Sequence, residues 1–373
     1  MGTGPRVAVV HERFTEPGGS EAVVEQMLAC WPEATIYAPV VDRSALPPGL
    51  CGADVRPGPL DRLYRGGRTY AHLLPLLPVA MARLRLDDCD LVLASHHAFA
   101  NRARAPHPDV PVVCYVHTPA RWIHDATLRR GEWGGRIGSA ALAAFAASQR
   151  RPDRRAAARP ALLLANSTEV AARVARWWGR RAAVLPPPVN TDFFTPDPSV
   201  AREDFLLLAG RLVPYKRPDL AVRAARRAGV RLVVVGDGRM RATVQALAGP
   251  GVEVLGRVDD QELLALFRRC RGLVFPGVED AGIVPVEAQA CGAPVLAVGR
   301  GGALDTVVDG VTGCLYDAPT AAEEERVLAA AMRDFDASSY DPATIRLRAE
   351  RFSRQAFRAG LTHHVAQVLT AAS

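Results

Sequence analysis

The feature that most constrains the fold of this chain is a repeated alternation of short apolar runs with helix-forming segments. In the first half, apolar runs occupy residues 7–11, 34–37, 91–95, 110–116 and 161–166, and another starts at 184–185. These runs show little alternation between apolar and polar residues, which is typical of strands that are buried on both faces of a parallel sheet. The pattern therefore predicts an α/β fold in which helices cover both faces of parallel sheets.

A proline-rich segment divides this alternation into two blocks. Residues 186–198 contain five prolines, a composition that favours a stiff linker. The second block has apolar runs at 205–209, 231–235, 252–255, 272–276, 295–297 and 313–316. A chain of 373 residues is long enough for two domains.

We therefore predict two doubly wound, Rossmann-like domains that face a cleft. The predicted segments are an N-terminal domain at 1–185, a linker at 186–203, a C-terminal domain at 204–345 and a C-terminal helix at 346–373 that packs back on the first domain.

The composition is that of a globular protein, with 49% hydrophobic and 23% charged residues. No apolar run approaches the ~18 residues of a membrane span, and the N-terminus lacks the apolar core of a signal peptide. We therefore expect a cytoplasmic protein. The seven cysteines include no Cys-x-x-Cys pair, which favours reduced thiols over disulfides or a zinc site.

Positive charge is concentrated in the first half of the chain. Residues 1–185 contain 24 arginines against 16 acidic residues. This excess favours an anionic partner, either a phosphorylated acceptor or an acidic membrane surface contacted through Arg129, Arg130 and residues 150–159. General surface charge remains the alternative. We expect no nucleic-acid partner, because the arginines show no recognised binding module and no interleaved aromatic residues.

Only one of the 46 basic residues is a lysine, Lys216. An ammonium group is compact and a guanidinium group is wide and planar, so a single lysine suggests a site too small for arginine. Lys216 lies five residues after Arg211, in the segment that follows the run at 205–209. Open α/β sheets bind ligands beyond the carboxyl ends of their strands, where two cations suit a diphosphate. A solvated basic loop is the alternative.

A second candidate motif follows the run at 272–276. Gly282 permits close approach of the backbone, and Pro285 suits the first turn of a helix, whose free N–H groups attract phosphate. Glu287 in that turn can accept hydrogen bonds from ribose hydroxyls, and Glu279 can accept one from a sugar hydroxyl. Alternatively, both carboxylates only stabilise the start of the helix.

Two helices in the first half have predictable starts. Gly18 and Gly19 open a helix over 21–30 with Ser20 as its N-cap. Ser167 is a good N-cap for a second helix, which follows the apolar run at 161–166. The apolar face of that second helix is predicted to contain Val170, Val174 and Trp177.

Taken together, these motifs resemble glycosyltransferase family 4, whose members are retaining enzymes with the GT-B fold. In the second half the resemblance is carried, over about 205–317, by Gly210-Arg211 with Lys216, Val235-Gly-Asp-Gly238, the segment 256–263, Glu279-x7-Glu287 and Asp309-Gly-x-x-Gly313. In the first half it is carried by Gly18-Gly-Ser-Glu21, Ser95-His-His, His117-Thr-Pro119 and Asn166-Ser167. One departure is Ala281, where the family often has an aromatic residue. This difference is expected to change how the donor sugar packs in the site.

The resemblance implies a retaining hexosyltransferase that moves a sugar, with mannosyl favoured, from a GDP- or UDP-linked donor to a hydroxyl acceptor. The resemblance does not identify the acceptor; lipid-linked and anionic compounds are both candidates. The implied catalytic residues are His117, Arg211, Lys216 and Glu279. The implied donor-binding residues are Gly18, Gly19, Arg211, Lys216, Gly282, Ile283, Val284 and Glu287. The candidate acceptor-binding residues are Glu12, His97 and Thr118.

We expect neither a metal ion nor an organic cofactor. Arg211, Lys216 and a helix N-terminus supply the positive charge that a leaving diphosphate needs. Asp88-Cys-Asp90 has the form of a metal-binding motif, but it directly precedes the run at 91–95, so we interpret it as the cap of a strand.

Three alternatives remain. One is another GT-B enzyme, such as a nucleotide-sugar epimerase, and a second is a catalytically inactive relative that binds nucleotide sugars. A pyridoxal-dependent phosphorylase would need a lysine other than Lys216. The third, a dinucleotide-dependent oxidoreductase, is disfavoured because no Gly-x-Gly-x-x-Gly follows a first strand.

Overall fold

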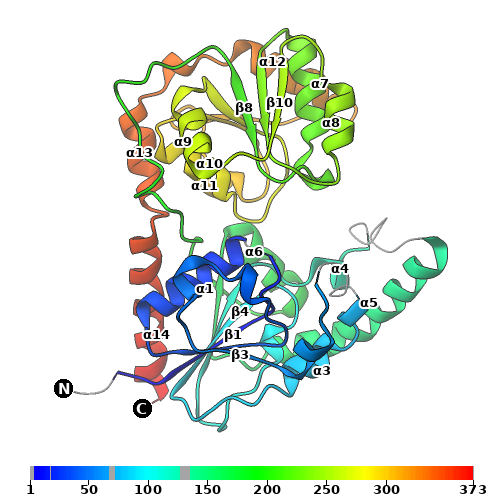
Figure 1. Cartoon of the computed structure of the whole chain (residues 1–373), viewed down its shortest axis with the longest axis vertical. Helices are drawn as coiled ribbons and strands as arrows, with labels where there is room; N and C mark the ends of the chain where they lie inside the picture. Colours follow the sequence, from blue (N-terminus) through cyan, green and yellow to red (C-terminus); the bar gives the residue numbers. More distant parts are fainter. Residues whose placement is uncertain (1–3, 17, 67–71, 127–134, 373) are drawn as a thin grey trace. The chain divides into compact units, whose positions relative to one another are not determined.

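The computed structural model describes residues 4–16, 18–66, 72–126 and 135–372, which fall into two compact units (Figure 1). Unit 1 comprises Met1–Pro187 together with Phe357–Ser373, and unit 2 comprises Pro188–Ala356. Each unit contains one parallel β-sheet with helices on its faces. The predicted α/β fold with two doubly wound sheets is therefore confirmed.

The sheet of unit 1 has seven strands in the order β3-β2-β1-β4-β5-β6-β7. They are β1 Val7–His11, β2 Thr35–Ala38, β3 Val55–Pro57, β4 Leu91–His96, β5 Val112–Val116, β6 Leu162–Ala165 and β7 Ala183–Val184. The strand order reverses at β1 and β4, which pair in parallel over Val7–His11. Such a reversal is the place where open α/β sheets bind ligands.

Successive residues of the central strands of unit 1 enter different core clusters. Val10 packs in one cluster with Val92, whereas Val9 packs in the other with Leu93, as expected for a strand covered on both faces. The helices of unit 1 are α1 Gly19–Cys30, α3 Leu77–Ala82, α4 Arg121–His124, α5 Gly135–Ala157, α6 Thr168–Arg173 and most of α14 Arg354–Ala372. Phe357 of α14 is buried in the second cluster.

The sheet of unit 2 has six strands in the order β10-β9-β8-β11-β12-β13. They are β8 Leu206–Ala209, β9 Leu232–Val235, β10 Val252–Gly256, β11 Gly272–Phe275, β12 Val295–Val298 and β13 Gly313–Tyr316. Here the order reverses between β8 and β11. The helices are α7 Pro218–Ala228, α8 Arg241–Leu247, α9 Asp260–Arg269, α10 Ile283–Ala290, α11 Ala303–Thr306, α12 Glu324–Asp334 and α13 Pro342–Glu350.

Each predicted apolar run is a strand whose bounds differ by at most two residues. The strand β3 was not predicted; it has only three residues and ends in Pro57. Proline cannot donate a ladder hydrogen bond and is tolerated at a sheet edge, which is where β3 lies.

The predicted cap of α1 was wrong. Gly18 occupies the N-cap position with an extended backbone, while Ser20 is inside the helix and its hydroxyl donates to Glu21. The cap of α6 is confirmed, because the Ser167 hydroxyl accepts a hydrogen bond from the N–H of Val170 at 3.1 Å.

The predicted apolar face of this second helix is confirmed. Val170 and Val174 are buried in the first cluster, and Trp177 is partly buried against the same cluster, where its ring stacks on His124 with centroids 5.0 Å apart. A π-helical turn at Val174–Trp178 follows α6, and Trp178 is buried in this cluster as well.

All seven cysteines are free thiols. Within the described ranges, no helix combines the length and apolar character needed to cross a membrane.

Candidate active site

In unit 2, the sole lysine is paired with a predicted site carboxylate. Lys216 ends a 3₁₀ turn after β8, and its Nζ donates to Oε1 of Glu279 at 2.7 Å. The two side chains are only 15% and 17% exposed. Glu279 follows β11, so the structure joins the two predicted loops across the reversal of strand order. Arg211 in the same loop donates through Nη2 to the Tyr215 hydroxyl at 3.1 Å.

Two glycines allow these loops to meet. A Cβ atom at Gly277, just after β11, would lie 2.6 Å from the Cα of Lys216. Gly210 has a φ of 127°, a conformation that side chains disfavour, and a Cβ there would lie 3.4 Å from the Lys216 ammonium. The backbone itself therefore forms part of the wall around Lys216.

The helix α10 begins at Ile283, four residues after Glu279 in the sequence. Gly282 is its N-cap with a φ of 74°, and no side chain caps the helix. Ile283 and Val284 are its first two residues, so their N–H groups lie in the turn that has no intrahelical acceptors. This end carries the positive pole of the helix dipole and suits an anion.

Glu287 lies on α10 and is half-buried. Removal from water is the main cause that raises the pKa of Glu287, the charge of Asp260 adds to it and the charge of Lys216 opposes it, and together they bring the pKa to about 7. Such a strongly perturbed carboxyl group, on which the charge of Lys216 acts, is typical of a functional site.

In unit 1, Gly18 and Gly19 form the start of α1 after β1. A Cβ atom at Gly18 would lie 3.0 Å from Oε2 of Glu21. The missing side chain therefore leaves room for the Glu21 carboxylate beside the helix N-terminus.

The predicted residue His117 ends a chain of four hydrogen-bonding side chains. Nε2 of His117 lies 2.8 Å from Oγ of Ser95, which lies 3.0 Å from Nδ1 of His11. Nε2 of His11 lies 3.3 Å from Oε1 of Glu21. His11, Ser95 and Glu21 are buried, and His117 is partly exposed, so only the last member of the chain is open to a ligand.

The protonation of the two ends of this chain is strongly perturbed. Burial raises the pKa of Glu21, but hydrogen bonds from His11 and Ser20 and the charge of His11 lower it to about 2. Burial lowers the pKa of His117 to about 3, together with repulsion from His11. At neutral pH, Glu21 is therefore ionised and His117 is neutral.

The three candidate acceptor residues have different surroundings. Glu12 is 1% exposed, and its Oε1 accepts four backbone N–H groups from residues 97–100. The Glu12 carboxylate therefore holds the loop after β4, and its role as an acceptor ligand stays a prediction. His97 is in that loop and lies 3.3 Å from an Arg13 nitrogen. Thr118 is partly exposed and accepts from Arg173 at 3.4 Å.

Sequence reasoning named Glu21 and Ser95 only as parts of motifs and did not select His11. The available signal was that His11, Ser95 and His117 are polar residues at or just beyond the carboxyl ends of β1, β4 and β5. Polar residues that end otherwise apolar strands meet at one edge of a parallel sheet.

The two aspartates of the Asp88-Cys-Asp90 motif contact basic side chains. Asp90 accepts from the backbone and side chain of Arg6, and Asp88 contacts His107 at 3.1 Å. The part of the chain that the structure describes contains no group of acidic, histidine and cysteine side chains able to hold a metal ion. Arg129 and Arg130 lie outside the described residues.

Two models of known protein families match this chain. The family model described as Glycosyltransferase Family 4 matches residues 17–193, and the model described as Glycosyl transferases group 1 matches residues 191–339. Together they span residues 17–339, which lie in both units. The chain belongs to glycosyltransferase family 4.

Solved structures support the same fold for this glycosyltransferase. Sucrose-phosphate synthase from Thermosynechococcus elongatus superimposes with a TM-score of 0.71 at 16% identity, covering 98% of this chain and 100% of that chain. HepE from Anabaena in complex with UDP superimposes with a TM-score of 0.66 at 18% identity, covering 97% and 100%. The predicted GT-B fold is therefore confirmed.

A relative with higher sequence identity matches only a segment. The D-inositol 3-phosphate glycosyltransferase of Mycobacterium tuberculosis is 36% identical over 125 residues. This match covers 30% of the present glycosyltransferase and 26% of that relative.

Proposed function

We propose that this glycosyltransferase moves a hexosyl group from a nucleotide-diphosphate sugar to a hydroxyl acceptor, with retention of configuration. The sequence resemblance favours GDP-mannose as the donor. The HepE structures include complexes with UDP and with UDP-glucose, so UDP-glucose is the natural comparison.

The observation that carries this proposal is the Lys216–Glu279 pair beside the start of α10. Lys216 has three N–H donors, so it can keep its 2.7 Å contact with Glu279 and still donate to a phosphate oxygen. Glu279 would then accept a hydrogen bond from the adjacent sugar. The Lys216–Glu279 pair can therefore contact both the phosphate and the sugar that flank the bond that breaks.

Cleavage of that bond leaves a nucleoside diphosphate with additional negative charge. Arg211, Lys216 and the N–H groups of Ile283 and Val284 would stabilise this charge as it develops, which lowers the barrier to transfer. The ribose hydroxyls would donate to Glu287 in its ionised form.

His117 would contact the reacting sugar, with its ring fixed by the buried chain behind it. If Nε2–H of His11 donates to the Glu21 carboxylate, Nδ1 of His11 accepts the hydroxyl proton of Ser95. Ser95 Oγ then accepts from Nε2–H of His117. This arrangement leaves Nδ1 of His117 as a hydrogen-bond acceptor for a sugar hydroxyl.

An anionic acceptor suits the excess of arginine in the first half of the chain. The name of the mycobacterial relative points to a phosphorylated acceptor for that protein, and inositol phosphates are therefore the first acceptors to test. We also propose that the protein is cytoplasmic and contacts an acidic membrane peripherally.

The test combines binding with product analysis. Thermal-shift titrations with GDP and UDP should identify the base, because a ligand at 100 times its Kd adds about 2.7 kcal/mol of stability. Incubation with the matching nucleotide sugars and an acceptor should release free nucleotide and a glycosylated product.

Other outcomes identify the alternatives. Formation of an epimerised nucleotide sugar without acceptor would indicate an epimerase. Tight nucleotide binding without any turnover across donors and acceptors would indicate an inactive relative.

A further inference from the structure

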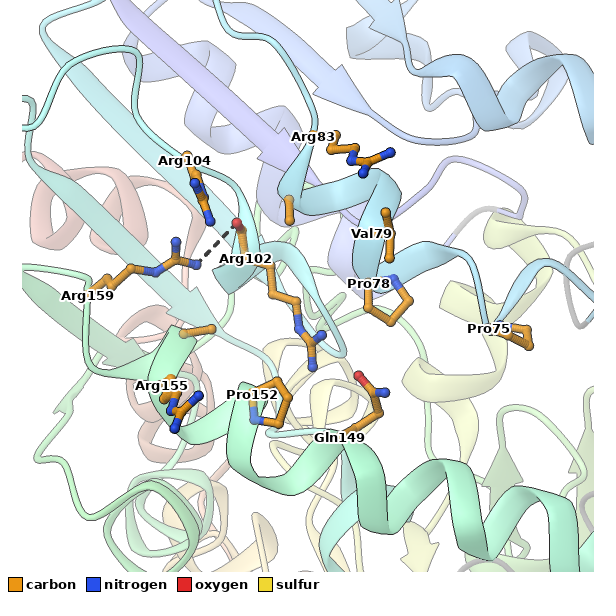
Figure 2. A pocket seen from close by; sticks show the side chains of 12 residues that line it. Pro75, Pro78, Val79, Arg83, Arg102, Arg104, Gln149, Pro152, Arg155 and Arg159 are labelled. Carbon is orange, nitrogen blue, oxygen red and sulfur yellow. Dashed lines mark hydrogen bonds between the residues drawn. The ribbon is translucent and has the colours of Figure 1, made fainter.

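A cavity of about 660 Å³ in unit 1 is surrounded by arginines (Figure 2). Among the described residues that line it, none is acidic. The five arginines that line it are Arg83, Arg102, Arg104, Arg155 and Arg159. A concave site with several cations and no carboxylate in its wall is electrostatically prepared for an anion.

This cavity is separate from the candidate active site of unit 1. Its walls come from α3 with Arg83, which leads to β4, from the end of α5, which leads to β6, and from the segment that leads from β4 towards β5. Two of these walls therefore approach the amino ends of strands. His117 and its chain lie at the carboxyl ends.

Arg102 is the buried member of the group. It is 8% exposed, and Figure 2 shows its guanidinium pointing into the cavity between Pro152 and Gln149. Within the described residues, Nε and Nη2 of Arg102 have no hydrogen-bond partner. Its planar group lies 5.0 Å from the centre of the Phe99 ring. Burial lowers the pKa of Arg102.

Nearby carboxylates do not satisfy these N–H groups. Glu12 and Asp153 are the acidic residues whose charges act on Arg102, but Glu12 is occupied by four backbone N–H groups. Asp153 accepts from His124 at 2.8 Å and from the Trp178 indole at 2.6 Å. A buried cation without hydrogen-bond partners is costly, so a ligand with acceptor oxygens would relieve an existing penalty.

The remaining wall offers further polar groups. The amide oxygen of Gln149 is also buried without a partner in the described part of the chain. Arg159 is held at the wall because its Nη2 donates to the carbonyls of Asn101 and Arg102 at 3.1 and 3.2 Å. Arg104 and Arg155 are exposed at the rim, where they can reach a second anionic oxygen.

We propose that this cavity is a binding site for a phosphate group, with Arg102 as its buried ligand. Guanidinium matches the geometry of phosphate oxygens through paired hydrogen bonds. The same phosphate chemistry is offered by a phospholipid headgroup and by a soluble phosphate ester. The cavity therefore gives the basic N-terminal half one defined contact for an anion.

The first test uses inorganic phosphate and the full-length protein. Arg102→Met removes the charge and keeps an unbranched apolar chain, and Arg43→Met is the matched control at an exposed arginine in the same unit. Both substitutions are made in a Lys216→Ala background, which removes one expected donor-site contact to phosphate. Thermal shift is compared between sodium phosphate and sodium chloride at equal ionic strength.

We expect phosphate to raise the melting temperature of the background protein and of its Arg43→Met form. Arg102→Met should weaken phosphate binding at least tenfold while folding normally. If Arg102→Met keeps the full phosphate effect, the proposal is wrong. If that variant does not fold, Arg155→Glu at the exposed rim replaces it, with the same expected loss and the same refuting result.

A second arm distinguishes the source of the phosphate. Sedimentation with phosphatidylglycerol vesicles is compared with sedimentation with phosphatidylcholine vesicles for the same variants. Loss of phosphatidylglycerol binding in Arg102→Met, but not in Arg43→Met, identifies a lipid headgroup. Equal vesicle binding by both variants, with loss of the phosphate effect only in Arg102→Met, identifies a soluble ligand. If Arg102→Met keeps the full phosphate effect, the proposal is refuted whatever the vesicle result.

Discussion

Replacing Glu287 by Gln should stabilise the protein above neutral pH and weaken its donor binding. The pKa of Glu287 is raised from 4.5 to about 7, mainly because the carboxylate is removed from water. The folded protein therefore binds this proton more tightly than the unfolded chain does. The resulting stability is fully present below pH 4.5 and is lost as the pH rises through about 7.

The size of the effect follows from the two pKa values. At about 1.4 kcal/mol for each pKa unit, ionisation of Glu287 costs roughly 3 kcal/mol of folding free energy. The side chain is half-buried, and solvent screening reduces this figure, so we take about half of it, ~1.5 kcal/mol. For a unit the size of Pro188–Ala356, that corresponds to about 3–6 °C in melting temperature.

The assay is a series of thermal melts of wild type and Glu287→Gln between pH 5 and pH 8.5. The two proteins should melt together at the acidic end, and the variant should melt about 3–6 °C higher at the alkaline end. Nucleotide binding by wild type should strengthen as Glu287 ionises, by up to about tenfold between pH 6 and pH 8, and the variant should lack this dependence. A melting difference that does not change with pH would refute the reasoning.

Three further predictions concern the same reaction. Lys216→Arg should lower kcat and kcat/KM by roughly 10²–10³, because a guanidinium does not fit beside Gly210 and Gly277; near-normal turnover of the folded variant in steady-state kinetics would contradict this. Ser95→Ala should lower kcat about tenfold with little change in KM, because it breaks the chain behind His117, and Ser95→Thr should restore part of the loss; equal kinetics for all three proteins would show that the chain is only structural. Turnover should survive EDTA, because cationic side chains and a helix N-terminus serve the leaving group; full loss that magnesium or manganese restores would contradict this.

The sequence by itself determined the architecture of this glycosyltransferase. Apolar runs such as 7–11 and 205–209 are buried in the structure, and their lack of alternation already indicates strands in parallel sheets. Lys216 and Glu279 were also found from the sequence, because each follows a strand. The short edge strand β3 was not predicted, because three residues ending in Pro57 show almost no periodic pattern.

The tertiary structure decided which polar groups meet. Glu21, His11, Ser95 and His117 are up to 106 positions apart in the printed sequence, and only the order of β1, β4 and β5 in the sheet brings them into one hydrogen-bonded chain. Burial is likewise a property of the assembled fold. It distinguishes Arg102, whose guanidinium faces a cavity (Figure 2) and has two nitrogens without a partner among the described residues, from the exposed arginines around it.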